Sequence, residues 1–227
     1  MIWIIISAII SGLASVWLGY KRLIYLYQVT GRRFLIASLL ALSLYSLLLF
    51  LFKIEVLSEA VAGAIITNVY ASIFGFFTGS AFNQFQYRKE NGPVLYCYRS
   101  FISEHLPVII ALSLILFGVY RSAVFTDLIV TPIRVSSGLS LLSVGLWGIT
   151  LRLVPEFRAN GIILLDLIID WDSVLSYRWF GEEVIEIEYT QNDAIRHFKT
   201  LVPMDERSEI ESLLSKKMRE KMEKEDS

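Results

Sequence analysis

The sequence predicts a membrane all-α bundle of about five helices followed by a small α+β domain. Hydrophobic residues make up 55% of the 227 positions, the mean hydropathy is +0.56, and the apolar residues are gathered in long blocks. Residues 1–153 carry eleven Lys/Arg and five Asp/Glu, whereas residues 154–227 carry ten and seventeen. Such asymmetry indicates two physical environments, so we expect a helical part at 1–154 and a separate domain at 155–227.

Each expected span has the length needed to cross the hydrocarbon core, roughly 20 residues. The expected spans are residues 2–19, 34–52, 57–83, 103–123 and 136–154. The first lacks a basic leading segment and is followed directly by Lys21 and Arg22, which favours a signal anchor over a cleaved signal peptide. The fourth has a short apolar core. If it were only re-entrant, the chain would cross the membrane one time fewer and the carboxyl terminus would change side.

Basic residues are concentrated in alternate loops, and this sets the orientation through the positive-inside rule. The loop after the first span carries Lys21, Arg22, Arg32 and Arg33, which are also our candidates for contact with anionic lipid. The loop between the third and fourth spans carries Arg88, Lys89 and Arg99, whereas the opposite loops carry Lys53, Arg121 and Arg134. We therefore expect the amino terminus outside and the carboxyl-terminal domain in the cytoplasm.

Small residues at helical spacing predict close packing between the spans. The candidates for helix packing are Gly12, Gly19, Gly75, Gly79 and Gly145, together with the polar Asn68. Because helices in lipid associate through close backbone approach, such seams act either within one bundle or between copies of the chain; we expect the former. No Asp, Glu, Lys or Arg lies in the middle of a span, which argues against pumps and proton relays. For Asn68 we expect an interhelical hydrogen bond rather than substrate binding.

After Pro155 the hydrophobic period changes to two, which is typical of β-strands. Asn160-Gly161 predicts a two-residue hairpin turn, in which both positions favour positive φ. In the run "EEVIEIEY", Ile187 is expected on a buried face. Its neighbour Glu186 is expected on a solvated face, where a charge reversal is tolerated.

A terminal helix is predicted in "DERSEIESLLSKKMREKMEKED", with Asp205 as its N-cap. Its apolar stripe consists of Ile210, Leu213, Leu214, Met218 and Met222. A stripe at this spacing is typical of a helix that covers a sheet. We expect Trp171 and Trp179 to fill the core beneath it or to brace the sheet against the membrane surface.

The stretches "NGIILL", "WDSVLSYRW", "VIEIEY" and "FKTLVPMDERSEIESLL" resemble the bacterial pleckstrin-homology-like (PH-like) domain, in which antiparallel strands are followed by one helix. The chain also resembles bacterial multi-pass membrane proteins in which such a domain follows several spanning helices. The resemblance implies a bacterial cytoplasmic membrane as the location. It implies no enzymatic activity.

No motif in the chain predicts catalysis. Glu104 and His105 are adjacent on a helix, so their side chains diverge by about 100° and do not face each other. Cys97 and His197 have no partner in a nucleophile motif. With one cysteine and two histidines, we expect no disulfide, metal site or cofactor, and nothing is typical of nucleic-acid binding.

These observations favour a non-enzymatic integral membrane protein that acts as a scaffold, assembly or regulatory subunit. Its expected partners are membrane lipids and another membrane or cytoplasmic protein; a homo-oligomer stays open. The acidic balance of residues 154–227 argues against phosphoinositide headgroups and favours a protein with a basic surface. The alternative is a small transporter or channel accessory for an uncharged or lipidic substrate, which a continuous polar cavity around Asn68 would indicate.

Overall fold

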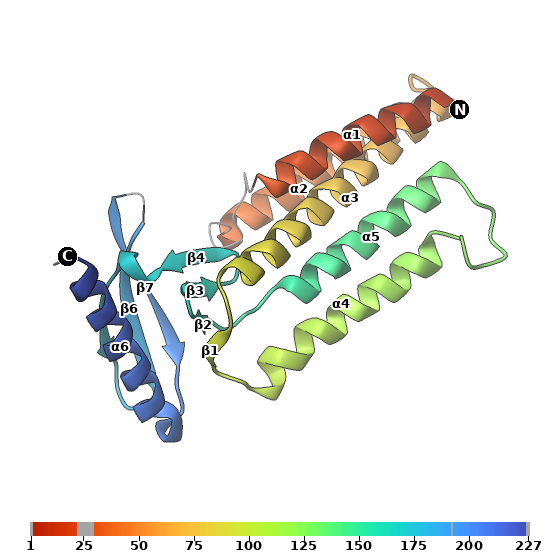
Figure 1. Cartoon of the computed structure of the whole chain (residues 1–227). Helices are drawn as coiled ribbons and strands as arrows, with labels where there is room; N and C mark the ends of the chain where they lie inside the picture. Colours follow the sequence, from red (N-terminus) through yellow and green to blue (C-terminus); the bar gives the residue numbers. More distant parts are fainter. Residues whose placement is uncertain (1, 22–29, 192, 226–227) are drawn as a thin grey trace. The chain divides into compact units, whose positions relative to one another are not determined.

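The computed structural model describes residues 2–21, 30–191 and 193–225 of the chain. It divides into two compact units, each made of two segments. The first unit comprises Met1–Gln86 and His105–Leu151, and the second comprises Tyr87–Glu104 and Arg152–Ser227. Figure 1 shows a helical part and a β-sheet part, which we describe separately.

Five described helices are long and apolar enough to cross a membrane. They are α1 (Ile2–Tyr20), α2 (Gly31–Lys53), α3 (Glu59–Glu90), α4 (Phe101–Arg121) and α5 (Pro132–Thr150). The sequence therefore located all five elements, with differences at their ends. Helix α5 begins four residues before the expected position 136, because Thr131 caps it: its Oγ1 accepts a hydrogen bond from the Arg134 backbone N–H at 3.3 Å.

Helix α2 presents apolar side chains on all sides. None of its 23 residues is buried, although leucine and phenylalanine dominate its sequence. Its start is fixed locally by Thr30, whose Oγ1 accepts from the Arg33 backbone N–H at 3.4 Å. A helix that is apolar all round is stable only in an apolar environment, within a larger core or in a lipid bilayer.

The second unit contains two antiparallel sheets and a terminal helix (Figure 1). The first sheet has the order β1 (Val94–Cys97), β2 (Glu156–Arg158), β3 (Gly161–Leu164) and β4 (Leu167–Asp170). The second has the order β5 (Val174–Trp179), β6 (Val184–Gln191) and β7 (Ala194–Leu201), and helix α6 (Arg207–Glu225) follows it. The coarse expectation of an antiparallel sheet region followed by one helix is confirmed.

Strand β1 departs from the expected boundary at residues 154/155. It precedes α4 in the chain but pairs with β2, with Cys97 opposite Glu156. Tyr96 holds it in place: the residue is 6% exposed, its ring centre lies 5.7 Å from that of Phe157, and its hydroxyl donates to Glu206 Oε2 at 2.7 Å. The second unit is therefore discontinuous in sequence, with the α4–α5 hairpin inserted between its first two strands.

The Asn160-Gly161 signal correctly located a hairpin but not its turn geometry. Strands β2 and β3 pair with Phe157 opposite Ile162, yet neither Asn160 nor Gly161 has a positive φ. The reason lies in the segment before β1, whose backbone carbonyls accept hydrogen bonds from the loop between β2 and β3. The Asn160 side-chain amide donates to the Glu90 carbonyl at 3.2 Å, and the Ala159 backbone N–H donates to the Pro93 carbonyl at 3.1 Å.

Alternation in the second sheet is partly as expected. Ile185 and Ile187 are fully buried and share a core with Ile210 and Leu214 of α6. The expectation that Glu186 is solvated is wrong, because the residue is only 3% exposed. Arg178 on β5 and Lys199 on β7 flank Glu186 and form ion pairs with its carboxylate.

Helix α6 begins differently from the expectation. Asp205 does not act as its N-cap; it lies inside a 3₁₀ turn, Met204–Glu206, that follows Pro203 and leads into the helix. Of the predicted stripe, Ile210 and Leu214 are fully buried, whereas Met222 is 54% exposed. The far end of α6 is held instead by the Lys221 ammonium group, which donates to the Val174 carbonyl at 2.9 Å.

Candidate functional site

The second unit has a pocket of about 230 Å³ beside the β1–β2 pair. Its charged and reactive lining residues are Cys97, Arg99, Glu104, Arg152, Glu156 and Arg158. They come from three places: β1 and the residues after it, the connection that follows α5, and β2. Pairing of β1 with β2 therefore brings together side chains that are about 50 to 60 residues apart in the sequence.

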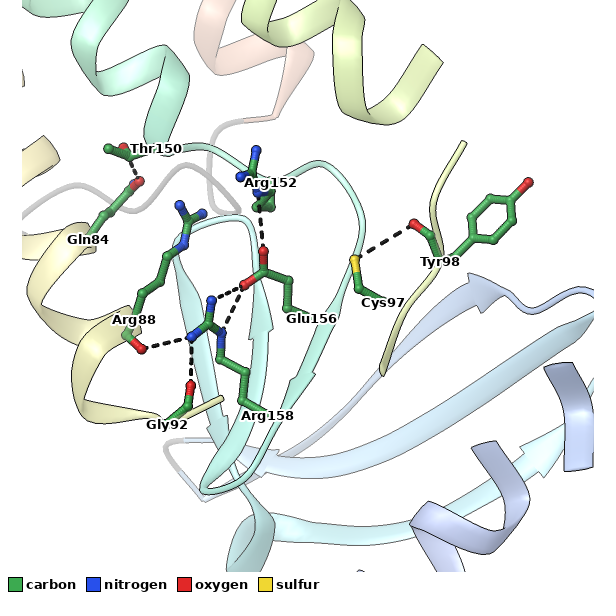
Figure 2. Close-up of polar contacts among 9 residues, drawn as sticks. All are labelled: Gln84, Arg88, Gly92, Cys97, Tyr98, Thr150, Arg152, Glu156 and Arg158. Atoms are coloured by element: carbon green, nitrogen blue, oxygen red, sulfur yellow. Dashed lines mark hydrogen bonds and ion pairs between the residues drawn. The ribbon is translucent and has the colours of Figure 1, made fainter. Parts of the chain in front are cut away.

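Glu156 is the centre of this pocket (Figure 2). The residue is 5% exposed, and its two carboxylate oxygens face different arginines. Arg152 Nε donates to Oε1 at 3.2 Å, while Arg158 donates to Oε2 through Nε at 2.9 Å and Nη2 at 2.7 Å. A buried carboxylate needs this compensation, because its desolvation would otherwise raise the free energy of the folded state.

Arg158 also ties the β-sheet to the end of α3. Its Nη1 donates to the carbonyl oxygens of Arg88 and Gly92, each at 2.8 Å (Figure 2). Trp171 supports the same strand: its indole N–H donates to the Arg158 carbonyl at 3.0 Å and its ring lies 6.4 Å from Phe157. Arg158 is thus a structural residue whose charge is balanced by Glu156.

Two further arginines are present without such a partner. No hydrogen bond or ion pair of the Arg88 or Arg99 side chain is found among the residues that the structure describes. Arg88 lies within electrostatic range of Glu156, Arg152 and Arg158. Four arginines against Glu104 and Glu156 give the cluster a formal charge of 4 − 2 = +2.

Cys97 lies in this pocket as a neutral thiol. Burial raises the pKa of the thiol, and the nearby Glu156 carboxylate raises it further, against the opposite influence of Arg99 and Arg152. Its Sγ lies 3.7 Å from the Tyr98 carbonyl oxygen, to which it donates (Figure 2). Since nucleophilic cysteines act as thiolates, this environment disfavours covalent catalysis.

The predicted packing glycines lie at contacts between helices. A Cβ atom on Gly75 would lie 2.1 Å from the Gly12 carbonyl oxygen, and one on Gly19 would lie 2.1 Å from the Phe76 carbonyl oxygen. Gly79 approaches Val16 in the same way, with a distance of 2.2 Å. These positions join α1 to α3.

Gly145 and Asn68 lie at other helix contacts. A Cβ on Gly145 would lie 2.7 Å from the Ala111 carbonyl, so this glycine joins α5 to α4. The Asn68 amide donates to Ser7 Oγ at 2.9 Å and to the Ala64 carbonyl at 2.8 Å, and its oxygen accepts from Ser11 at 3.0 Å. Asn68 thus bridges α3 to α1.

The three described lipid-contact candidates do not line the pocket. Lys21, Arg32 and Arg33 are exposed, and Arg22 lies outside the described residues. The pocket residues were missed because Arg88 and Arg99 were interpreted only as determinants of topology. Two local signals could have identified the site. The run "PVLYCY" is a short strand-like stretch between helices, and Glu156 and Arg158 are two apart on one strand face.

The helical unit has a different cavity, of about 600 Å³, lined by residues of α1, α3 and α5 and of the segment before α5. Most of its lining is apolar, including Ile9, Leu13 and Leu139. Thr67 lines it as well, and the Thr67 hydroxyl has no hydrogen-bond partner among the described residues. Asn68, around which the transporter alternative would require a continuous polar cavity, is not among the residues that line this cavity.

Comparison with known proteins finds a match for one part of the chain. Residues 153–219 match the model of a family described as "Domain of unknown function (DUF5673)". The match includes β2 to β7 and most of α6, whereas β1 precedes it. No curated protein and no solved structure matches the chain.

Proposed function

We propose that this protein is a non-enzymatic membrane scaffold, assembly or regulatory subunit that holds a PH-like domain at the cytoplasmic face of a bacterial membrane. The observation that carries the proposal is the pairing of β1 with β2 across the inserted α4–α5 hairpin. Two paired strands of one sheet lie on the same side of a membrane. The segment between β1 and β2, which contains α4 and α5, therefore crosses the membrane an even number of times.

This parity supports five spans. If α5 crosses, α4 must cross as well, and a re-entrant fourth segment is incompatible with the strand pairing. At about 1.5 Å per residue, the 21 residues of α4 reach the roughly 30 Å of a hydrocarbon core. The exposed apolar surface of α2 supports insertion of the helical part into lipid.

The orientation rests on the basic residues. Arg88, Lys89 and Arg99 flank β1, and Arg152 and Arg158 flank or lie in β2, so the whole sheet unit is on the positive side. Three short connections tether this unit to α3, α4 and α5. The arrangement of a four-stranded and a three-stranded antiparallel sheet followed by one helix supports the PH-like assignment.

A scaffold is favoured over a transporter by the state of the polar groups. All hydrogen-bonding atoms of the Asn68 side chain have partners on α1 or within α3. The raised pKa of Cys97 and the internal pairing of Glu156 argue against acid–base or nucleophilic chemistry in the pocket. The exposed surface of the second unit is then available for a protein partner.

Topology reporters test this proposal directly. Reporters inserted in the β1–α4 connection and fused after Ser227 should both read cytoplasmic, while one at Met1 should read external. For the scaffold role, a partner that copurifies stoichiometrically in mild detergent should be lost when residues 152–227 are deleted. Opposite readings for the two cytoplasmic reporters would contradict the five-span architecture.

The apolar cavity favours one alternative, an accessory for a lipidic substrate. A hydrocarbon chain fits a lining of apolar residues with one free hydroxyl at Thr67. Val135→Trp should fill this cavity, so lipid that copurifies with the wild type would be displaced. Retention of the same lipid by the variant would exclude the alternative.

A further inference from the structure

We propose that the arginine pocket of the second unit binds the phosphate group of an anionic phospholipid. The sequence of residues 154–227 alone argues against such a ligand, because acidic residues outnumber basic ones there. The fold changes this local balance by adding Arg88 and Arg99 from the segment that contains β1. What matters for an anion is the formal charge of the residues in and beside the pocket, which is +2 because four arginines outnumber two glutamates there.

The arginines divide into structural and available groups. Arg158 is committed to Glu156 and to two backbone carbonyls. Arg152 uses Nε for Glu156 and is 40% exposed along its side chain. Arg99 lines the pocket and is exposed, and neither Arg88 nor Arg99 has a hydrogen bond or ion pair among the described side chains.

Guanidinium chemistry selects the ligand. Arginine presents paired N–H donors that match the oxygens of a phosphate, and such charge-assisted bonds are about twice as strong as neutral ones. Glu156 does not bond Arg99: its Oε1 accepts from Arg152 and its Oε2 accepts twice from Arg158. A phosphate of charge −1 or −2 would supply the missing acceptor, and the pocket volume of about 230 Å³ is large enough for it.

The position of these residues in the chain indicates lipid as the source. Arg88 is in the last turn of α3, Arg99 lies two residues before α4, and Arg152 lies two residues after α5. In the proposed topology, on which this step rests, the cytoplasmic ends of these spans lie at headgroup level. Basic pockets at the cytoplasmic ends of spanning helices are known sites for anionic headgroups.

Lipid titration of the full-length protein in neutral detergent tests the proposal. The ligands are dihexanoyl phosphatidylglycerol, dihexanoyl phosphatidylcholine and inorganic phosphate. Apparent Kd values follow from the ligand-dependent shift in thermal midpoint. We expect phosphatidylglycerol to bind and phosphatidylcholine to bind at least about tenfold more weakly. Arg99→Gln and Arg152→Gln should each raise the apparent Kd for phosphatidylglycerol about tenfold.

Two variants keep this test informative. Arg99→Gln removes a side chain that has no hydrogen bond or ion pair among the described residues, so this variant should keep the fold. It remains usable as a test if Arg152→Gln, which removes an ion pair with Glu156, destabilises the protein. Arg196→Gln makes the same charge change on β7 of the same unit, away from the pocket, and should leave the Kd unchanged.

Three outcomes would overturn the proposal. One is no binding of phosphatidylglycerol, and another is equal binding by wild type and Arg99→Gln. The third is inorganic phosphate that binds as tightly as the lipid and depends on Arg99, which would assign the pocket to free phosphate. Because the topology reporters are read in cells without added lipid, failure here is distinguishable from failure of the proposed membrane architecture.

Discussion

Glu186 illustrates how a charged residue on a strand can be part of the folded structure. Its neighbours across the sheet are Arg178 on β5 and Lys199 on β7, and both contribute ion pairs. Lys199 also places its ammonium group 3.7 Å from the centre of the Phe180 ring, which restrains it over the sheet. The hydrogen bond from Arg178 lowers the pKa of the Glu186 carboxyl, so this glutamate is ionised when folded.

Charge reversal at Glu186 is predicted to destabilise the second unit. Glu186→Lys would place three cations side by side on neighbouring strands, whereas Glu186→Gln keeps the shape and removes only the charge. We expect the thermal midpoint to fall in the order wild type, Glu186→Gln, Glu186→Lys, measured by circular dichroism. Ile187→Asp, at a fully buried position, should unfold the unit.

The same residue makes a prediction about pH. Because its pKa is lowered by folding, its contribution to stability is present above the unfolded pKa and is lost as pH falls through the folded pKa. Wild type should therefore lose more stability than Glu186→Gln between neutral and acidic pH. Parallel curves of midpoint against pH for the two proteins would contradict this account.

Asn68 is the corresponding polar residue of the helical unit. Asn68→Leu removes the hydrogen bonds of this side chain to Ser7 and Ser11. The two serine hydroxyls keep partners within α1, because they also donate to the Ile4 and Ala8 carbonyls. We predict that the free energy of unfolding falls by about 0.6–2 kcal/mol, which is the usual contribution of an interhelical hydrogen bond in a membrane. The measurement is unfolding in detergent micelles. A large loss of lipid or solute flux with unchanged folding would instead indicate a permeation site.

At the scale of elements, glycine contacts decide which helices pair. A Cβ at Gly75 meets the Gly12 backbone at 2.1 Å, so Gly75→Ala is predicted to separate α1 from α3 and to lower thermal stability. Gly63 is the matched control on the same helix, because its Cβ would meet only Ile133 Cδ1, at 3.8 Å. Equal midpoints for Gly75→Ala and Gly63→Ala would contradict the role of this contact.

The helices could be predicted from the sequence, and the pairing of strand β1 with β2 could not. Stretches of 19 or more mostly apolar residues give a strong local signal, so all five helices were expected, and the largest difference at an end is seven residues, at the end of α3. Strand β1 has only four residues and is separated from its partner β2 by the whole α4–α5 hairpin. Nothing in its own composition indicates a partner so distant in the chain.

The candidate site was hidden for the same reason. Arg88 lies in the last turn of α3, and Arg99 and Arg152 lie just before α4 and just after α5, where basic residues are expected from topology alone. Only the β1–β2 pairing shows that Arg99 and Arg152 line one pocket around Glu156, with Arg88 within electrostatic range of that carboxylate. Glu186 was misjudged for a different reason, because period-two alternation indicates which face a residue is on but not whether that face is covered by long side chains.

At the scale of the whole molecule, the inserted hairpin makes folding of the second unit depend on the segment before α4. A fragment of residues 155–227 lacks β1 and with it Tyr96, which is 6% exposed and bonded to Glu206. Loss of a buried aromatic side chain costs about 3–5 kcal/mol. A domain of this size has a total stability of only about 3–5 kcal/mol.

We therefore predict that the fragment 155–227 is largely unfolded, whereas a fusion of residues 87–99 to residues 152–227 through a short Gly/Ser linker folds cooperatively. A short linker suffices, because Cys97 and Glu156 are already paired across the two strands. Thermal unfolding by circular dichroism compares the two proteins. The control is the fusion carrying Tyr96→Ala, which should behave like the fragment because it retains the β1 backbone without the buried ring. If the fragment alone unfolds with the same midpoint and cooperativity as the fusion, then β1 is dispensable for the fold of the second unit. The β1–β2 pairing would then no longer support the proposal that α4 and α5 cross the membrane together.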